Sequence, residues 1–247
     1  MRFTRHIPNA LTCGNLVCGC IATWAAFAGH FAATTAFIFA AVLFDFMDGL
    51  AARLLHATSP IGKDLDSLAD IVSFGFAPGA MLYRFLDVIA ASVPDDRIPL
   101  AVSLLAVFTP LVIPVCSALR LAKFNNDPRQ ATSFIGLPVP AHAIFWASLL
   151  VSFVRMSHDT QVFNDLPTMW TLTLIVLAIA GSLLLVSELP MFSLKVKSLA
   201  WRGNERRYLL LLAAIVLTIV LPALTGISAT ILLYILMSAY DRFTAPT

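Results

Sequence analysis

Apolar residues form long runs along the whole chain, and short polar segments separate them. Several runs reach the ~20 predominantly apolar residues that a helix needs to cross a ~30 Å hydrocarbon core. We count eight candidate spans, near residues 8–28, 31–55, 66–90, 98–122, 138–156, 168–187, 208–222 and 224–241. The pattern therefore predicts an all-α fold, a polytopic membrane helical bundle.

Composition supports this prediction and adds the domain organisation. Hydrophobic residues make up 59% of the chain and charged residues only 12%, whereas about a quarter of the residues in a soluble domain are charged. The sequence contains no repeat of fixed period and no low-complexity stretch. We expect one integral membrane domain over residues 1–247.

The distribution of basic residues predicts the orientation of the spans. An even number of spans puts both termini on one side of the membrane. With that side cytoplasmic, only Arg84, Arg97 and Arg155 of the 16 lysines and arginines lie in a span or an outer loop. We expect a multi-pass protein of a bacterial inner membrane with cytoplasmic termini. The net charge of +2 then reflects topology and lipid head groups, and indicates no nucleic-acid partner.

The first apolar run allows two interpretations. Arg2 and Arg5 precede it, as basic residues precede the core of a cleaved signal peptide. Polar residues recur within it at helical spacing, at Asn9, Thr12 and Asn15. That spacing favours a retained helix with one face turned toward a polar site.

Acidic residues are concentrated where the second span joins the third. Five of the chain's 14 acids lie there: Asp45, Asp48, Asp64, Asp66 and Asp70. An ionised side chain inside a membrane helix costs roughly 2.5–3.5 kcal/mol on insertion scales, and neighbouring like charges repel. Bound cations would offset both penalties.

Helical spacing puts these carboxylates into two facing pairs. Asp45 and Asp48 share one helix face, and Asp66 and Asp70 share another. A turn through Ser59, Pro60 and Gly62 would bring the two helices back antiparallel, so that the pairs converge. Ligands that are all oxygen suit Mg²⁺ or Mn²⁺ better than zinc.

Small residues beside the acids suggest close approach by a ligand. Gly49 and Ala52 could instead form a contact between two helices, but next to four acids we favour the ligand interpretation. Asp64 lies outside the pattern and is interpreted as a solvated loop charge. The pattern reads Asp45-x2-Asp48-Gly49-x2-Ala52-Arg53-x8-Gly62-x3-Asp66-x3-Asp70.

This pattern resembles the complete signature of the CDP-alcohol phosphotransferase family. The resemblance implies a six-helix core, here extended by two C-terminal helices, a homodimer, and two divalent ions bridged by the four aspartates. It implies that Asp70 also takes the proton of the acceptor hydroxyl. It places the CDP-diacylglycerol donor near Asp48, Gly49, Ala52, Arg53 and Gly62, to which we add Asn9 and Thr12 of the first helix.

Further segments are similar to the serine-using branch of this family, the bacterial and archaeal phosphatidylserine synthases. They are Ile7–Asn9, Asp66–Pro78, Arg120–Asn125 and Phe134–Ala141, and the resemblance spans residues 7–198. Serine carries a carboxylate, an ammonium group and a hydroxyl, so its pocket should supply a cationic donor and polar acceptors. We expect L-serine to contact Ser73, Arg120, Lys123 and Asn125.

Two alternatives remain at this stage. Another acceptor, such as glycerol 3-phosphate or inositol phosphate, would need more cationic side chains for its phosphate. A cation-coupled transporter can also carry carboxylates in its spans. The acids lie near the cytoplasmic ends of their spans, however, and the chain lacks the internal repeat that transporters often show.

Overall fold

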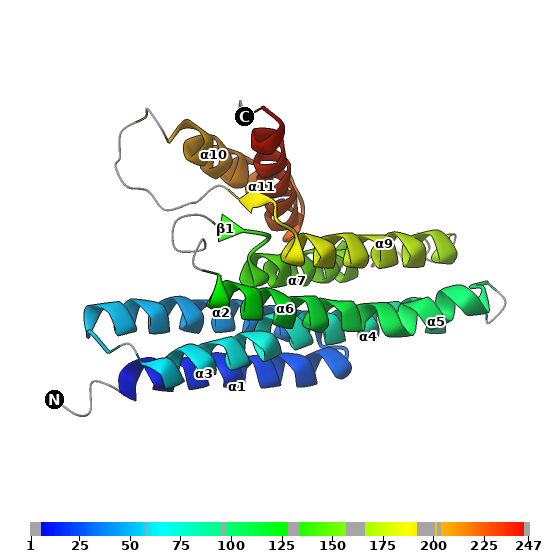
Figure 1. The fold of residues 1–247 in the computed structure, drawn as a ribbon. Helices are drawn as coiled ribbons and strands as arrows, with labels where there is room; N and C mark the ends of the chain where they lie inside the picture. The colour runs from blue at the N-terminus through cyan, green and yellow to red at the C-terminus, as the bar shows by residue number, and fades with distance from the viewer. Residues whose placement is uncertain are drawn as a thin grey trace.

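The computed structural model describes residues 6–57, 59–94, 97–127, 134–156, 166–191, 201 and 204–244, and these residues form a helical bundle (Figure 1). Its helices are α1 (Ile7–Phe27), α2 (Phe31–Leu54), α3 (Pro60–Asp70), the π-helical segment η2 (Ile71–Phe76), α4 (Ala77–Ala91), α5 (Leu100–Phe108), the 3-10 turn η3 (Thr109–Leu111), α6 (Val112–Asn126), α7 (Val139–Met156), α9 (Pro167–Val186), α10 (Glu205–Val220) and α11 (Thr225–Thr244).

Six helical segments of the described chain are long and apolar enough to cross a membrane. They are Ile7–Phe27, Phe31–Leu54, Pro60–Ala91, Leu100–Asn126, Val139–Met156 and Pro167–Val186. Large apolar side chains such as Trp24, Leu104 and Val176 point outward from them, as expected for surfaces that face lipid. The prediction of a polytopic membrane bundle is confirmed.

The third span begins earlier than the sequence predicted. Ser59 caps α3 by accepting a hydrogen bond from the backbone N–H of Gly62 at 3.1 Å, and Pro60 occupies the first turn. Serine is favoured as an N-cap and proline at the first helical position. The prediction that Pro60 and Gly62 form the turn was therefore wrong, because both already belong to the helix.

Prolines in the spans change the type of helix. The third span becomes π-helical at Ile71–Phe76, directly before Pro78, and the fourth contains a 3-10 turn that includes Pro110. Proline has no backbone N–H and disturbs the hydrogen bonds of the turn before it. The π-helical segment starts right after Asp70, and Pro78 thus shapes the span beside the acids.

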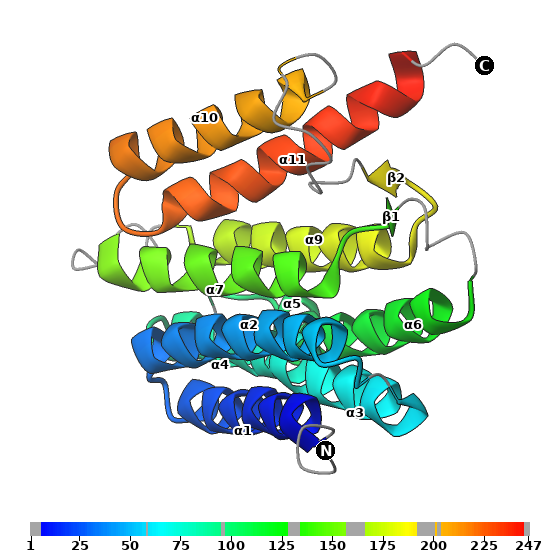
Figure 2. The same ribbon diagram turned by 90° about the vertical axis from the view of Figure 1, so that its left-hand side faces the viewer.

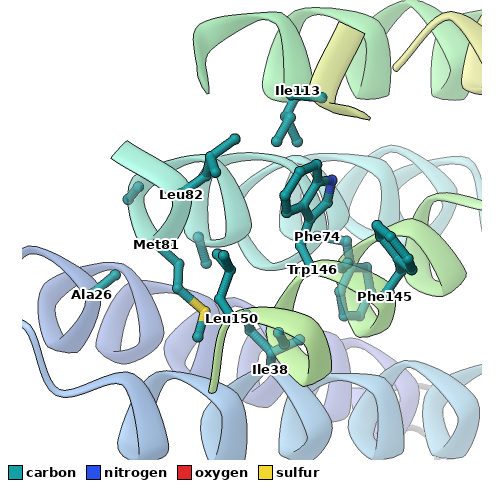
Figure 3. Packing of buried hydrophobic residues seen from close by; sticks show 14 of the residues in the cluster. Ala26, Ile38, Phe74, Met81, Leu82, Ile113, Phe145, Trp146 and Leu150 are labelled. Atoms are coloured by element: carbon teal, nitrogen blue, oxygen red, sulfur yellow. The ribbon is translucent and has the colours of Figure 1, made fainter. Parts of the chain in front are cut away.

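The core lies where α1, α2, α4 and α7 meet. Figure 3 shows Phe74, Met81 and Leu82 of the third span packed with Trp146 and Leu150 of α7. Gly19 of α1 allows an especially close contact with η2, since a Cβ there would lie 2.8 Å from the Cα of Ser73. This contact holds α1 against the segment that follows the acids.

The last two helices form an antiparallel hairpin that packs on α7 and is inclined to the other helices (Figures 1 and 2). α10 has 16 residues, about 24 Å at 1.5 Å per residue, which is less than the ~30 Å hydrocarbon core. The apolar part of α11 is also short, Thr225–Tyr240. That these two helices cross the membrane stays a prediction.

A short β-ladder connects the loops next to the hairpin. β1 (Phe134–Ile135) pairs antiparallel with β2 (Pro190–Met191), and β2 also contacts α11. Apart from this ladder the described chain is helical, so the all-α class is confirmed.

Candidate active site

A cavity of about 540 Å³ opens where α1 begins, α2 ends and α3 begins, toward the left-hand end of the bundle in Figure 1. Every residue that lines it comes from these helices or from the turn between α2 and α3. They are Pro8, Asn9, Thr12, Asp48, Gly49, Ala52, Ala57, Ser59, Pro60, Gly62, Lys63 and Asp66. Most of the positions predicted to contact the donor therefore surround one space.

Three carboxylates meet beside this cavity. One oxygen atom from each of Asp45, Asp48 and Asp66 lies within 4.8 Å of the other two. Asp48 Oδ2 and Asp66 Oδ1 are buried and have no hydrogen-bond partner among the described residues. Buried carboxylate oxygens at such spacing repel one another unless a cation lies between them. The donor set fits an oxygen-coordinated divalent ion.

Asp70 lies next to this group but not within it. Its Oδ1 accepts a hydrogen bond from Nδ2 of Asn15 at 3.1 Å, and the side chain is buried. It interacts electrostatically with all three clustered aspartates. The structure thus groups three of the four predicted ligands and sets the fourth beside them, held in place by α1.

Gly49 faces the cavity and not another helix. A Cβ added at Gly49 would meet only the guanidinium of Arg53, at 3.8 Å. A glycine retained for helix packing would have backbone or side-chain atoms much closer, as Gly19 does. Gly49 is thus not explained by a close helix contact, and its role in ligand binding stays a prediction. Arg53 is exposed and is not among the residues that line the cavity.

The first turns of α1 and α3 form the opposite side of the cavity. A Cβ at Gly62 would lie 3.1 Å from Asn9 Oδ1, so the glycine lets the two turns approach. The Thr12 hydroxyl donates to the carbonyl of Pro8 at 3.0 Å. Asn9 and Thr12 line the cavity as predicted, which explains the polar face of this otherwise apolar helix.

Sequence reasoning missed Lys63 as a cavity residue. Its Nζ donates to the carbonyl of Asn125 at 2.9 Å, and the side chain is exposed along the rim. The charge pattern places Lys63 only among the cytoplasmic basic residues. Its spacing was the signal, because Lys63 lies three residues before Asp66 in α3 and residues three apart share a helix face.

Arg120, which was predicted to contact the acceptor, is a buried cation. Only 6% of its surface is exposed, its guanidinium carbon lies 4.9 Å above the ring of Phe124, and Nε has no hydrogen-bond partner among the described residues. Arg120 interacts electrostatically with Asp70. A buried guanidinium with an unused donor suits an anionic ligand.

The other three predicted serine contacts have partners within the protein. The Ser73 hydroxyl donates to the carbonyl of Asn15 at 3.0 Å and is fully buried. Lys123 Nζ donates to the carbonyl of Val186 at 3.1 Å, and Asn125 Nδ2 donates to the hydroxyl of Ser67 at 2.7 Å. The structure therefore gives these residues a role in holding helices together.

Comparison with known proteins agrees with this geometry. A model of the CDP-alcohol phosphatidyltransferase family matches residues 5–220. The chain belongs to this family. The match extends beyond residue 198, where the resemblance in sequence motifs ended, and includes α10 but not α11.

Several relatives within the family bear the name CDP-diacylglycerol–serine O-phosphatidyltransferase. A protein of Bacillus subtilis is 36% identical over 135 residues, which cover 55% of this chain and 70% of the relative. One of Mycobacterium leprae is 31% identical over 194 residues, 75% of this chain and 57% of the relative. One of Methanocaldococcus jannaschii is 33% identical over 152 residues, 62% of this chain and 60% of the relative.

The aligned regions thus span little more than half the length of several relatives. Family membership makes this CDP-alcohol phosphatidyltransferase a membrane-embedded enzyme of the transferase class. The family signature lies on α2 and α3, the helices that bring the carboxylates together.

Proposed function

We propose that this protein transfers a phosphatidyl group from CDP-diacylglycerol to the hydroxyl of L-serine, giving phosphatidylserine and CMP. One observation supports this function most directly. Buried carboxylate oxygens without partners and a buried arginine nitrogen without a partner occur in the same part of the bundle, linked through Asp70. The carboxylate oxygens suit a divalent cation that binds the pyrophosphate of the donor, and the arginine nitrogen suits the carboxylate of an amino acid.

The donor occupies the cavity between α1, α2 and α3 in this proposal. Asp48, Gly49 and Ala52 lie on one side of it, and Asn9, Thr12 and Gly62 lie on the other. Lys63 lines the cavity, and the Arg53 guanidinium lies beside Gly49. We assign these two cations to the negative charge of the pyrophosphate. The absence of a side chain at Gly49 leaves room for the nucleotide beside the acids.

Asp45, Asp48 and Asp66, with Asp70 beside them, would hold the metal, in line with the two-ion Mg²⁺ or Mn²⁺ site that the family resemblance implies. Bound divalent ions supply charge neutralisation at the pyrophosphate. The protein's own part is to place the four carboxylates on two antiparallel helices beside the cavity.

Asp70 acts as the general base. Asn15 occupies its Oδ1, and this bond orients the carboxylate so that Oδ2 can accept the proton of the serine hydroxyl. The serine oxygen forms a bond to the phosphorus that carries diacylglycerol. The bond from that phosphorus to the CMP oxygen breaks, and CMP leaves with the electron pair.

Arg120 binds the carboxylate of serine. Two observations support this role: Nε of Arg120 has no hydrogen-bond partner among the described residues, and Asp70, the proposed base, contributes to the electrostatics at Arg120. A phosphorylated acceptor would need additional buried cations. Among the described residues, Arg120 is the cation that is buried in this part of the bundle.

Offering several acceptors at once to purified protein tests this function. CDP-diacylglycerol is mixed with serine, inositol, glycerol 3-phosphate and choline in detergent and Mg²⁺ or Mn²⁺, and the lipid products are identified by mass spectrometry. We expect phosphatidylserine and an equal amount of CMP. Formation of a different phospholipid would show that another alcohol is the acceptor. If no phospholipid formed at all, the proposal of a transferase would be rejected.

We further propose that the cavity faces the cytoplasm of a bacterial inner membrane and that the enzyme is a homodimer. Two single cysteine variants test the orientation. Ile61 lies on the exposed first turn of α3, and Pro94 follows α4 near the other end of the bundle. A membrane-impermeant maleimide should label Ile61→Cys only from the cytoplasmic side and Pro94→Cys only from the outside, above the wild-type background. The reverse pattern would invert the topology.

A further inference from the structure

An ion pair in the second half of the third span has no part in the proposed reaction. The Arg84 guanidinium bonds to the Asp87 carboxylate one turn further along α4. The positive-inside pattern does not explain Arg84, because this residue lies within a span. Charged side chains inside a span are costly, and where they occur they usually face a binding site or a polar cavity.

A cavity of about 110 Å³ lies beside this pair, between α4, α5 and α9, at the end of the bundle opposite the acids (Figure 1). Three of its residues carry short side chains with oxygen atoms, Asp87 of α4, Ser103 of α5 and Thr171 of α9. Arg84 bonds to Oδ2 of Asp87, so Oδ1 can accept a hydrogen bond from a second group. The cavity can therefore bind a ligand that donates hydrogen bonds.

Thr171 is buried in this cavity with an unsatisfied hydroxyl. Only 2% of the residue is exposed, and its Oγ1 has no hydrogen-bond partner among the described residues. A threonine in a helix commonly donates to the carbonyl four residues earlier, as Thr35 and Thr173 do here. Because a buried hydroxyl without a partner is destabilising, a ligand that bonds to Thr171 would remove that penalty.

An apolar cavity of about 200 Å³ adjoins the first, since Tyr83 and Val107 line both. Apart from Tyr83 its lining residues are apolar, and they include Phe76, Gly79 and Pro114. These three lie near the middle of the third and fourth spans, whereas the oxygen-bearing residues lie near the span ends. The two cavities together form one site with a polar end near the membrane surface and an apolar end toward the membrane centre.

We propose that the two cavities bind one membrane phospholipid whose head group carries an ammonium. A phospholipid has its head at the surface and its acyl chains toward the centre, which is the order of the two cavities. A primary ammonium has three N–H donors, and Asp87, Ser103 and Thr171 offer three acceptors. One acyl chain occupies the apolar cavity, and Arg84 holds the Asp87 carboxylate in place.

An anionic head group suits the polar cavity less well. A phosphate or carboxylate that entered it would meet the like charge of Asp87, and Arg84 is not among the residues that line it. With the orientation proposed above, the bound lipid belongs to the outer leaflet. The proposal does not depend on which alcohol the enzyme uses, because this site lies at the end of the bundle opposite the acids.

Native mass spectrometry of the full-length protein in detergent tests the head-group contact, with phosphatidylethanolamine and phosphatidylglycerol as probes. We expect the wild-type protein to bind one phosphatidylethanolamine at least about tenfold more tightly than phosphatidylglycerol. Thr171→Val keeps the shape of the side chain and removes the hydroxyl, so affinity for phosphatidylethanolamine should fall about fivefold. Thr173→Val is the matched control, because the Thr173 hydroxyl is exposed and donates to the carbonyl of Met169.

The acyl-chain contact is tested where the two cavities meet. Val107→Phe places a ring at their junction and should weaken binding of phosphatidylethanolamine about tenfold. Leu104→Phe is the control, since Leu104 lies on the same helix, is 52% exposed and lines neither cavity. Thermal unfolding without added lipid should give the wild-type Tm for all four variants, which shows that each one is folded.

Three results would overturn the proposal. The wild-type protein could bind neither lipid, or it could bind both equally. Alternatively, Val107→Phe could turn a dimer into a monomer and leave lipid binding unchanged, in which case a second copy of the chain covers the apolar cavity. None of these measurements uses turnover, so failure of the proposed serine transfer would leave this inference standing, and the reverse also holds.

Discussion

The two sides of the site are built in different ways. The donor side consists of Asp45, Asp48, Asp66, Gly49 and Gly62, which lie close together in sequence on α2 and α3. The acceptor side that we propose centres on Arg120, which lies on α6, outside the two helices that carry the acids. A motif of fixed spacing can encode the donor side because two helices and one turn determine its geometry, whereas the acceptor side depends on how the whole bundle packs.

The largest effect should come from Asp70, which lies between the two sides. Asp70→Asn removes the base while an amide can still bond to Asn15, so we expect kcat to fall about 10²–10⁴-fold. Binding of CDP-diacylglycerol, measured by equilibrium dialysis, should persist. Near wild-type turnover of serine would show that the hydroxyl attacks without this base.

On the donor side, Asp48→Asn and Asp66→Asn should each reduce kcat/KM by about 10²–10³-fold, because the charge that stabilises the transition state is no longer held in place. Steady-state rates with saturating Mg²⁺ measure this loss. The control is Asp64→Asn, an exposed residue of the same helix outside the cavity. If Asp64→Asn lowered kcat/KM as much, the loss would come from the change in overall charge and not from the carboxylate cluster.

On the acceptor side, Arg120→Lys keeps the charge and removes the fork of donors. The KM for serine should rise about 10–100-fold, and that for CDP-diacylglycerol should change little. Varying each substrate at saturation of the other gives both constants. Equal increases in the two KM values would show that Arg120 does not act on serine alone, and the proposed separation of a donor side from an acceptor side would fail.

The smallest effect separates a cavity glycine from a packing glycine. Gly49→Ala adds a methyl group that meets only Arg53 at 3.8 Å, so the fold should remain stable, while the KM for CDP-diacylglycerol rises about tenfold.

Gly19→Ala is the contrasting variant, since its methyl group would lie 2.8 Å from the Cα of Ser73. It should lower the stability of the fold by about 1–3 kcal/mol. Thermal unfolding in detergent measures this. If Gly49→Ala proved the less stable of the two, Gly49 would be a packing residue after all.

The sequence predicted most of the spans and the carboxylate cluster. Apolar runs predicted eight spans, and six helices of the described chain are long and apolar enough to cross a membrane, because length and hydropathy are local properties. Helical spacing predicted that four aspartates converge, and the structure groups Asp45, Asp48 and Asp66. The start of the third span was misplaced because Pro60 reads as a turn residue although it suits the first turn of a helix.

The acceptor side could be predicted only in part. Arg120, Ser73, Lys123 and Asn125 were all expected there. Arg120 Nε has no hydrogen-bond partner among the described residues, whereas each of the other three bonds to a protein group. Those partners lie on other helices, so no local pattern indicates them.

Equilibrium binding of Mn²⁺ tests the difference between the two sides most directly. Purified protein stripped with chelator is titrated with Mn²⁺, and free Mn²⁺ is counted by electron paramagnetic resonance without any substrate. We expect the wild-type protein and Arg120→Lys to bind Mn²⁺ equally, and Asp48→Asn and Asp66→Asn to bind it at least about tenfold more weakly. Wild-type protein that binds no Mn²⁺, or aspartate variants that bind it as well as wild type, would contradict the assignment of the carboxylate cluster as a metal site.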